Sequence, residues 1–183
     1  MRIEQTPLVD CFIVHEKVHG DARGYFIETF NQRDFNAASG LDILFVQDNQ
    51  SRSSKGVLRG LHMQRGASAQ AKLVRVLEGA VLDIAVDLRK GSPSFGQHFS
   101  IELTADNHKQ FFVPAGFAHG FVVLSEAATF FYKVDKFYEP GNEVGIMYND
   151  KDLNINWQLA DNEIILSEKD KTLGSFADYA ASL

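Results

Sequence analysis

The sequence predicts a mainly β protein, folded as an antiparallel sandwich or jelly-roll barrel with a few short helices at its periphery. Short runs rich in β-branched and aromatic residues recur along the 183-residue chain and end at Gly, Pro, Asn or Asp. Phenylalanine occurs 15 times, which favours thick sheet packing over a helical bundle. No linker, repeat or low-complexity tract interrupts the pattern, so residues 1–183 are expected to form one domain.

The strand pattern begins near the N-terminus and continues through most of the chain. The expected strands are residues 12–15, 25–30, 43–50, 57–64, 72–78, 81–88, 98–103, 110–113, 119–125 and 129–137. The segments LEGAV (77–81) and RKGSPSFG (89–96) are typical of tight connections between strands.

Three short helices are expected outside the sheets. Segment 31–40, NQRDFNAASG, has a polar capping residue, apolar spacing at Phe35 and Ala38, and a terminal glycine. A second helix is expected after Ser167, because SEKD offers a capping serine followed by acidic residues. The segment FADYAAS (176–182) is the third.

Alternation along the strands predicts which side chains share a face. Three such sets are His119, Phe121 and Val123; Phe130, Tyr132 and Val134; and Asp83, Ala85 and Asp87, opposite Leu82, Ile84 and Val86.

The stretch VLRGLHMQ (57–64) does not fit simple alternation. Arg59 and His62 have opposite parity, so a regular strand cannot place both side chains inside the barrel. If both line one pocket, the strand must bulge or turn between them, and Gly60 is the expected place.

Composition excludes several classes of function. The net charge of −6 argues against nucleic-acid binding, although basic side chains that converge locally can still hold an anionic small molecule. Cys11 is the only cysteine, which predicts no disulfide and fits a cytoplasmic location. The N-terminal segment lacks a signal-peptide layout, and no apolar run approaches the roughly 18 residues of a membrane span, so no membrane association is expected.

The segment VPAGFAHGF (113–121) has the spacing P-x-G-x-x-H and resembles the second signature of the cupin superfamily of jelly-roll barrels. The first cupin signature supplies two further metal-binding imidazoles and a carboxylate. Here His62 is followed by Gln64, and Lys72 stands seven residues before Gly79, where the carboxylate is expected. Because an ammonium cannot replace a carboxylate as ligand for a hard cation, no catalytic metal is expected.

One family matches more of the chain. The segments GDARGYFIETF, QDNQSRSSKGVLRGLHMQ, AKLVRVLEGAVLDIAVDLRKGSPSFG, FVPAGFAHGFVVLSEAATFFYKVDKFYEP and SEKDK, in this order, resemble the dTDP-4-dehydrorhamnose 3,5-epimerase family from about residue 8 to 170. Tyr25 departs from the family pattern, where a phenylalanine is expected.

The resemblance implies a cupin-type jelly roll, a dTDP-linked 4-keto-6-deoxyhexose as substrate, and no cofactor. The 4-keto group acidifies the C–H bonds at C3 and C5. A base removes one proton to give an enolate, and reprotonation on the opposite face inverts the centre. Such a site needs a base, an acid across the ring and a cation at the developing oxyanion.

The resemblance also implies residue roles. His62 is the expected base, Asp170 its paired carboxylate, Tyr132 the proton donor on the other face and Lys72 the cation near the C4 oxygen. The expected substrate-binding residues are Arg23, Phe26, Glu28, Gln47, Asn49, Arg59, His119, Tyr138, Glu143 and Lys169. In the family, the neighbouring subunit of a homodimer supplies some nucleotide contacts, and N-terminal strands exchange between subunits.

Plainer roles compete with these. His119 is equally well explained as a structural residue that bridges the barrel by hydrogen bonding to Asp83, and Asp170 as an ordinary charge in a first helical turn. A single-centre epimerase, a ketoisomerase of a related pathway, a non-enzymatic ligand-binding cupin and a metal-dependent cupin are the alternative functions. The final sugar, the strictness of thymine selection and the dimer arrangement are not predictable from the sequence.

Overall fold

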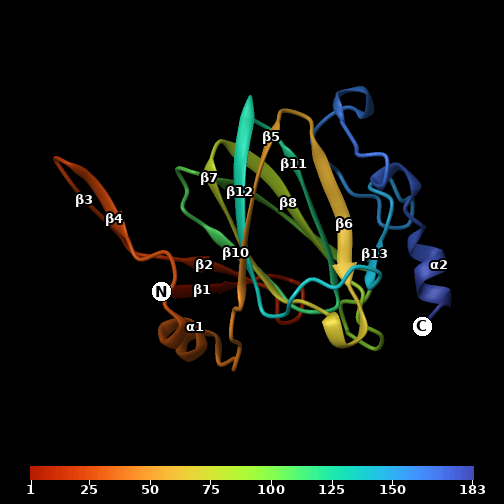
Figure 1. Ribbon diagram of the computed structural model, residues 1–183, viewed down its shortest axis with the longest axis horizontal. Coiled ribbons are helices and arrows are strands. Elements are labelled where there is room, and N and C mark those ends of the chain that lie inside the picture. The colour runs from red at the N-terminus through yellow and green to blue at the C-terminus, as the bar shows by residue number, and fades with distance from the viewer.

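The computed structural model describes all 183 residues and consists mainly of two antiparallel sheets that face each other (Figure 1). One sheet has the strand order β1 (Arg2–Gln5), β2 (Phe12–His15), β10 (Gln110–Val113), β7 (Lys72–Glu78), β12 (Ala127–Val134) and β5 (Gln47–Ser54). The other has the order β13 (Glu143–Gly145), β6 (Leu58–Gln64), β11 (Phe117–Val123), β8 (Ala80–Asp87) and β9 (His98–Thr104). The predicted fold class is confirmed.

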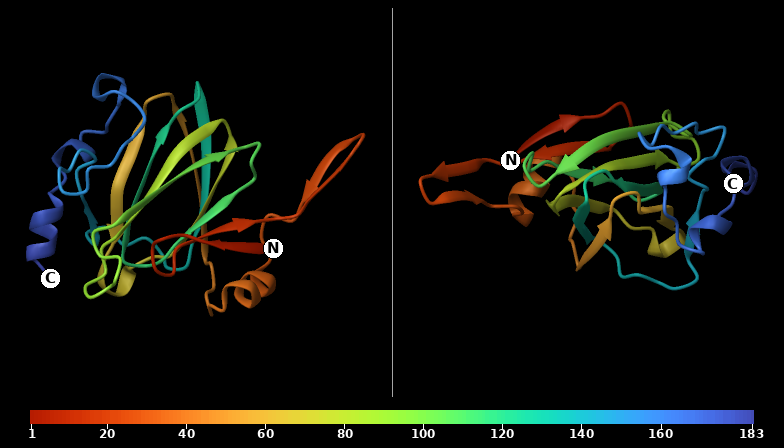
Figure 2. Two further views of the ribbon diagram at one scale, coloured as in Figure 1. Left: turned by 180° about the vertical axis from the view of Figure 1, so that it is seen from behind. Right: turned by 90° about the horizontal axis from the view of Figure 1, so that it is seen from above.

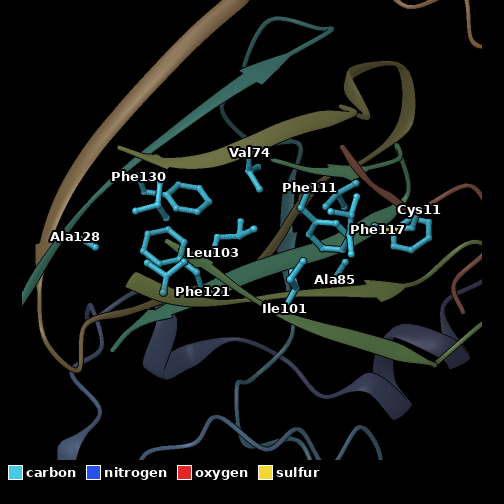
Figure 3. Packing of buried hydrophobic residues seen from close by; sticks show 14 of the residues in the cluster. Cys11, Val74, Ala85, Ile101, Leu103, Phe111, Phe117, Phe121, Ala128 and Phe130 are labelled. Atoms are coloured by element: carbon cyan, nitrogen blue, oxygen red, sulfur yellow. The ribbon is translucent and has the colours of Figure 1, made fainter. Parts of the chain in front are cut away.

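The space between the sheets is filled by an apolar cluster to which both contribute (Figure 3). Phe111 and Phe117 are among its fully buried members, and the stacked rings of Phe121 and Phe130 have centroids 4.1 Å apart. Ala85 belongs to this cluster, whereas Leu82, Ile84 and Val86 of the same strand belong to a second cluster on the outer face. The predicted alternation along β8 is therefore confirmed.

Each sheet also has a covered outer face. The second cluster packs sheet residues such as Leu82 against the C-terminal segment, including Leu153 and Trp157. A third cluster packs Phe35 of helix α1 (Gln32–Ser39) against Phe12 and Phe112 of the six-stranded sheet.

The first expected helix, α1, is confirmed, and so are its caps. The Asn31 side chain accepts a hydrogen bond from the Asp34 N–H, and Gly40 ends the helix with a φ of 71°. Helix α2 (Phe176–Ala181) matches the third expected helix. The second is corrected: the segment after Ser167 forms a short 3₁₀ turn, Asp170–Thr172, instead of an α-helix.

The central strands lie where the sequence predicts them, and the largest errors concern the edges. Expected strand 43–50 is shifted, because Ile43 and Phe45 pack against the α1 cluster and pairing with β12 begins only at Gln47. Expected strand 25–30 ends early, at Ile27, and 129–137 ends at Val134. Strands β1, β3 (Val18–Asp21) and β13 were not predicted.

Strands β3 and β4 (Gly24–Ile27) form a separate hairpin that projects away from the barrel (Figures 1 and 2). Its side chains are largely exposed, including the aromatic rings of Tyr25 and Phe26. Helix α2 and the C-terminus lie at the opposite end of the molecule. No helix has the length and apolar character needed to cross a bilayer.

Candidate active site

A cavity of about 580 Å³ opens between the two sheets. The four expected catalytic residues all line it: His62 on β6, Lys72 on β7, Tyr132 on β12, and Asp170 in the 3₁₀ turn. Four expected binding residues also line it, namely Asn49, Arg59, His119 and Lys169. Its volume falls in the range typical of sites that enclose small molecules.

The local structure of β6 explains how Arg59 and His62 reach the same cavity. His62 pairs with His119, Arg59 pairs with Phe121, and the register between β6 and β11 shifts between these two pairs. Gly60 lies at this irregularity with a φ of 129°, and its peptide bond to Leu61 is cis. A Cβ atom at Gly60 would lie 2.6 Å from the Cα of Gly120, so only glycine fits. The predicted distortion at Gly60 is confirmed.

His62 and Asp170 form a hydrogen-bonded pair. The His62 Nε2 lies 2.6 Å from Asp170 Oδ1, and Asp170 is only 4% exposed. The Asp170 backbone N–H donates to the Ser167 hydroxyl at 3.1 Å, which fixes the turn. A proton held on Nε2 by the carboxylate leaves Nδ1 as the basic nitrogen, and Nδ1 makes no hydrogen bond within the chain.

Lys72 and Tyr132 belong to the sheet opposite His62. Burial lowers the pKa of Lys72 to about 8, and the lysine forms no ion pair with any carboxylate. Burial also raises the pKa of Tyr132 above its usual value, an effect that the positive charge of Arg59 partly offsets. Tyr132 is therefore protonated at neutral pH, and Lys72 carries an ammonium that is free to donate to a ligand.

A second polar group borders the His62 pair. Glu143 on β13 accepts hydrogen bonds from Lys169 and from the Tyr138 hydroxyl, the latter at 3.1 Å, and lies 3.9 Å from His62 Nε2. Burial opposes its ionisation, but the hydrogen bonds from Lys169 and Tyr138 and the nearby charge of Lys169 hold the pKa of Glu143 below its usual value. This group brings Tyr138 and Glu143 beside the cavity.

Four other expected binding residues, Gln47, Asn49, Arg59 and His119, are each held by a hydrogen bond to another side chain. Gln47 donates to the Asn49 side chain at 2.9 Å, and the Arg59 Nε donates to the buried Ser53 hydroxyl at 3.1 Å. His119 Nε2 contacts both carboxylate oxygens of Asp83, at 2.9 and 3.0 Å. The expected hydrogen bond between His119 and Asp83 is therefore present, but it joins the neighbouring strands β11 and β8 of one sheet and does not cross the barrel.

Six of the ten expected binding residues do not line the cavity: Gln47, Tyr138 and Glu143 belong to hydrogen-bonded groups that include lining residues, and the other three lie on or beside the projecting hairpin. Arg23 and Phe26 are on the projecting hairpin and Glu28 directly follows it, and all three are exposed. The Arg23 guanidinium contacts only Asp21, 2.5 Å away, within the same hairpin. Within this chain, these three residues therefore do not reach the cavity.

The cavity also has lining residues that the sequence did not assign to the site, although alternation placed Phe121 and Phe130 on the same faces as His119 and Tyr132. Ile165, Leu166 and Ser167 come from an irregular segment that bridges to the start of β6, and Phe121 and Phe130 form an apolar floor. The segment has no periodic pattern that would predict its position.

The positions that bind metal in the cupin signatures have a different chemistry here. The buried Gln64 side chain accepts a hydrogen bond from the Glu139 backbone N–H, and Gln64 is absent from the cavity lining. No group of three or more His, Cys, Asp or Glu residues has the arrangement to hold a metal ion.

Comparisons with known proteins identify the same family that the sequence segments resemble. The family model for dTDP-4-dehydrorhamnose 3,5-epimerase matches residues 5–178. The chain is 51% identical to the dTDP-4-dehydrorhamnose 3,5-epimerase of Pseudomonas aeruginosa over 178 residues, 97% of each chain.

Two solved structures also align with nearly the whole chain. The crystal structure of dTDP-4-dehydrorhamnose 3,5-epimerase from Elizabethkingia anophelis NUHP1 aligns with a TM-score of 0.94 and 53% identity over 97% of both chains. A dTDP-6-deoxy-D-glucose-3,5-epimerase from Legionella pneumophila Philadelphia 1, solved in complex with dTDP-4-keto-L-rhamnose, aligns with a TM-score of 0.92 and 44% identity, over 97% of this chain and 96% of that one. The chain therefore belongs to the dTDP-4-dehydrorhamnose 3,5-epimerase family.

Proposed function

We propose that this epimerase inverts C3 and C5 of a dTDP-4-keto-6-deoxyhexose. His62 removes a proton from one face of the carbon, and Tyr132 delivers a proton to the opposite face. The observation that carries the proposal is the placement of these two side chains. They line one cavity from opposite sheets, and Lys72 lines the same cavity from the sheet that carries Tyr132. A planar enolate held between His62 and Tyr132 has one face toward each residue. That arrangement supports inversion, which requires proton removal from one face and delivery to the other.

The steps follow from the chemistry of the side chains. His62 Nδ1 removes the proton from the carbon next to the ketone, and Asp170 stabilises the resulting imidazolium. The electron pair moves onto the C4 oxygen, where the Lys72 ammonium stabilises the enolate. Tyr132 then protonates the carbon on the opposite face, and its raised pKa keeps the phenol protonated for this step.

Replacing Lys72 with methionine tests the oxyanion role. Loss of one preorganised donor typically costs ~2.7–4 kcal/mol of barrier, so kcat should fall roughly 10²- to 10³-fold. Because burial of an unpaired ammonium opposes folding, the methionine variant should melt at or above the wild-type temperature. Steady-state kinetics together with calorimetry check both parts. A variant that is inactive and also strongly destabilised would indicate a structural lysine instead.

The pH dependence of catalysis should also report Lys72. Its ammonium is the active form, and its pKa lies at about 8. The value of kcat/KM should therefore fall as the pH rises through about 8, since kcat/KM reports ionisations of the free enzyme. A rate that stays constant up to pH 10 would show that the ammonium is not required.

The number of centres inverted is decided by the product. Incubation with dTDP-4-keto-6-deoxyglucose, followed by proton NMR of the ring couplings, should show inversion at both C3 and C5. Inversion at one carbon would instead identify a single-centre epimerase, and an unchanged sugar that binds tightly would identify a ligand-binding protein.

The nucleotide end of the substrate requires a second subunit in this proposal. Arg23, Phe26 and Glu28 lie on or beside an exposed hairpin that leaves the barrel, and no residue of their own barrel contacts the Arg23 guanidinium. We expect a homodimer with exchanged N-terminal strands, in which each hairpin reaches the partner's cavity. Arg23 then contacts the diphosphate near Arg59.

Subunit complementation tests this arrangement. Arg23→Ala should raise KM roughly tenfold or more, the usual loss for a hydrogen bond to a charged group. Co-expression of Arg23→Ala subunits with inactive His62→Asn subunits should restore one normal site per mixed dimer, because the pocket with His62 receives Arg23 from its partner. Mixed dimers that keep the high KM would place Arg23 in its own subunit's site or outside any site.

A further inference from the structure

Asp83 is a buried carboxylate that the proposed reaction steps do not use. It lies on β8, between β11 and β9, with 0% exposure, and its only side-chain hydrogen-bond partner is His119 Nε2. Strand neighbour Ala85 belongs to the apolar core between the sheets. Burial of a carboxylate in such surroundings costs stability unless a positive charge compensates it.

Lys72 lines the same cavity as His119, the hydrogen-bond partner of Asp83. No carboxylate forms an ion pair with Lys72, and two carboxylates, first Asp83 and then Glu143, act on it electrostatically from a distance. Glu143 is already engaged by Lys169 and by the Tyr138 hydroxyl. The other ionisable groups that line the cavity around Lys72 are Arg59, His62, His119, Tyr132, Lys169 and Asp170. Asp83 has no lysine or arginine partner: its side chain contacts only His119, as the Asp170 side chain contacts only His62.

We propose that Asp83 is a positioning residue: its buried charge keeps Lys72 in the ammonium form inside the cavity and orients the ring of His119. This inference rests on the proposed function, in which Lys72 stabilises the enolate. The absence of a direct ion pair between Asp83 and Lys72 suits the proposed reaction. A direct ion pair would occupy the ammonium, whereas a carboxylate held back by His119 supports the positive charge and leaves its N–H groups free for the substrate oxygen.

The orientation of His119 follows from the same contact. A neutral imidazole that donates from Nε2 to Asp83 keeps its other nitrogen, Nδ1, as a hydrogen-bond acceptor. His119 lines the cavity, so Asp83 also fixes which hydrogen-bonding groups of this ring are offered to the sugar.

The variant Asp83→Asn separates charge from shape. The amide oxygen still accepts from His119, but the negative charge is lost. The alkaline limb of kcat/KM should move to lower pH by up to roughly one unit, the lower end of the shift that an opposite charge at ~4–6 Å produces. Activity near pH 6.5 should suffer less than activity at pH 8. A loss that is equal at every pH, with the limb unmoved, would overturn the proposal in favour of a structural role.

A direct titration follows the same group without substrate. The Cε resonance of Lys72, assigned by its disappearance in Lys72→Met, should titrate at lower pH in Asp83→Asn than in the wild type. Asp87→Asn is the matched control: Asp87 is also fully buried on β8, but Arg89, Ser92 and Ser94 are its partners. It should lose stability without moving the Lys72 titration. An equal movement in both variants would contradict a specific role for Asp83.

If Asp83→Asn does not fold, the ionisation state of Asp83 in the wild-type protein tests the proposal. The carboxyl carbon of Asp83 should show the chemical shift of an ionised carboxylate at pH 7, and a protonated carboxyl would overturn the proposal because it supplies no charge. The proposed function and the role of Asp83 are tested by different variants. Full activity of Lys72→Met would refute the proposed function, whereas an unmoved Lys72 titration in Asp83→Asn refutes only the role of Asp83.

Discussion

Replacing His62 with asparagine lowers kcat roughly 10²- to 10⁴-fold, the usual contribution of a general base. Asparagine keeps a group that can donate to Asp170 but provides no nitrogen basic enough to remove a proton next to a ketone. Proton removal is the first step at both carbons, so exchange with solvent and inversion should disappear together. Steady-state kinetics and deuterium incorporation, measured on the same preparation, check the two losses.

Binding provides the control for this variant. The expected nucleotide contacts lie away from His62, so the Kd for dTDP should stay within a few-fold of the wild-type value. Equal losses of dTDP affinity and activity would point to a collapsed pocket, and Asp170→Asn then distinguishes the cases. If the pair acts as proposed, Asp170→Asn should also lower kcat with little effect on dTDP binding, because the imidazolium loses its partner at 2.6 Å.

Replacing Tyr132 with phenylalanine produces a different pattern. The phenol is the acid on the opposite face, so its loss should lower the rate of inversion roughly 10²- to 10⁴-fold. His62 remains able to remove a proton and to return one to the same face. Deuterium from D₂O should therefore enter the sugar with its configuration retained, at a rate that exceeds inversion by a wide margin.

The separation of exchange from inversion is the decisive feature of the Tyr132 variant. Phenylalanine preserves the ring that packs near Phe130 at a centroid distance of 6.1 Å, so the cavity should keep its shape. A variant that still inverts at the wild-type rate would assign the second proton to another group. Loss of exchange as well as inversion would mean that Tyr132 takes part in proton removal.

The predictable part of the fold is the part whose burial leaves a pattern in the sequence. Strands β7 and β10 lie between other strands, and their apolar runs predicted both with their correct bounds. Edge strands such as β1 and β13 are held by hydrogen bonds to one neighbour and carry RIEQ and EVG, which have little apolar alternation. The partner of β13 is β6, which is distant in sequence, so no local pattern reveals that pairing.

The candidate site likewise has a part that the sequence pattern predicted and a part that it did not. Parity along VLRGLHMQ predicted a distortion at Gly60, because two polar side chains of opposite parity needed one cavity. The contact between His62 and Asp170 spans 108 positions, and only the resemblance to a known family placed the two together. Arg23 was expected at the site on the same grounds, but its hairpin projects away from the barrel of its own chain (Figure 1).

Turnover of dTDP-4-keto-6-deoxyglucose in D₂O tests most directly whether ring hydrogens leave as protons to His62 and return through Tyr132. The interpretation predicts a product that is inverted and carries deuterium at both C3 and C5. An inverted product that retains its original hydrogens at both carbons would contradict it, because no exchangeable side chain would then have carried the hydrogen.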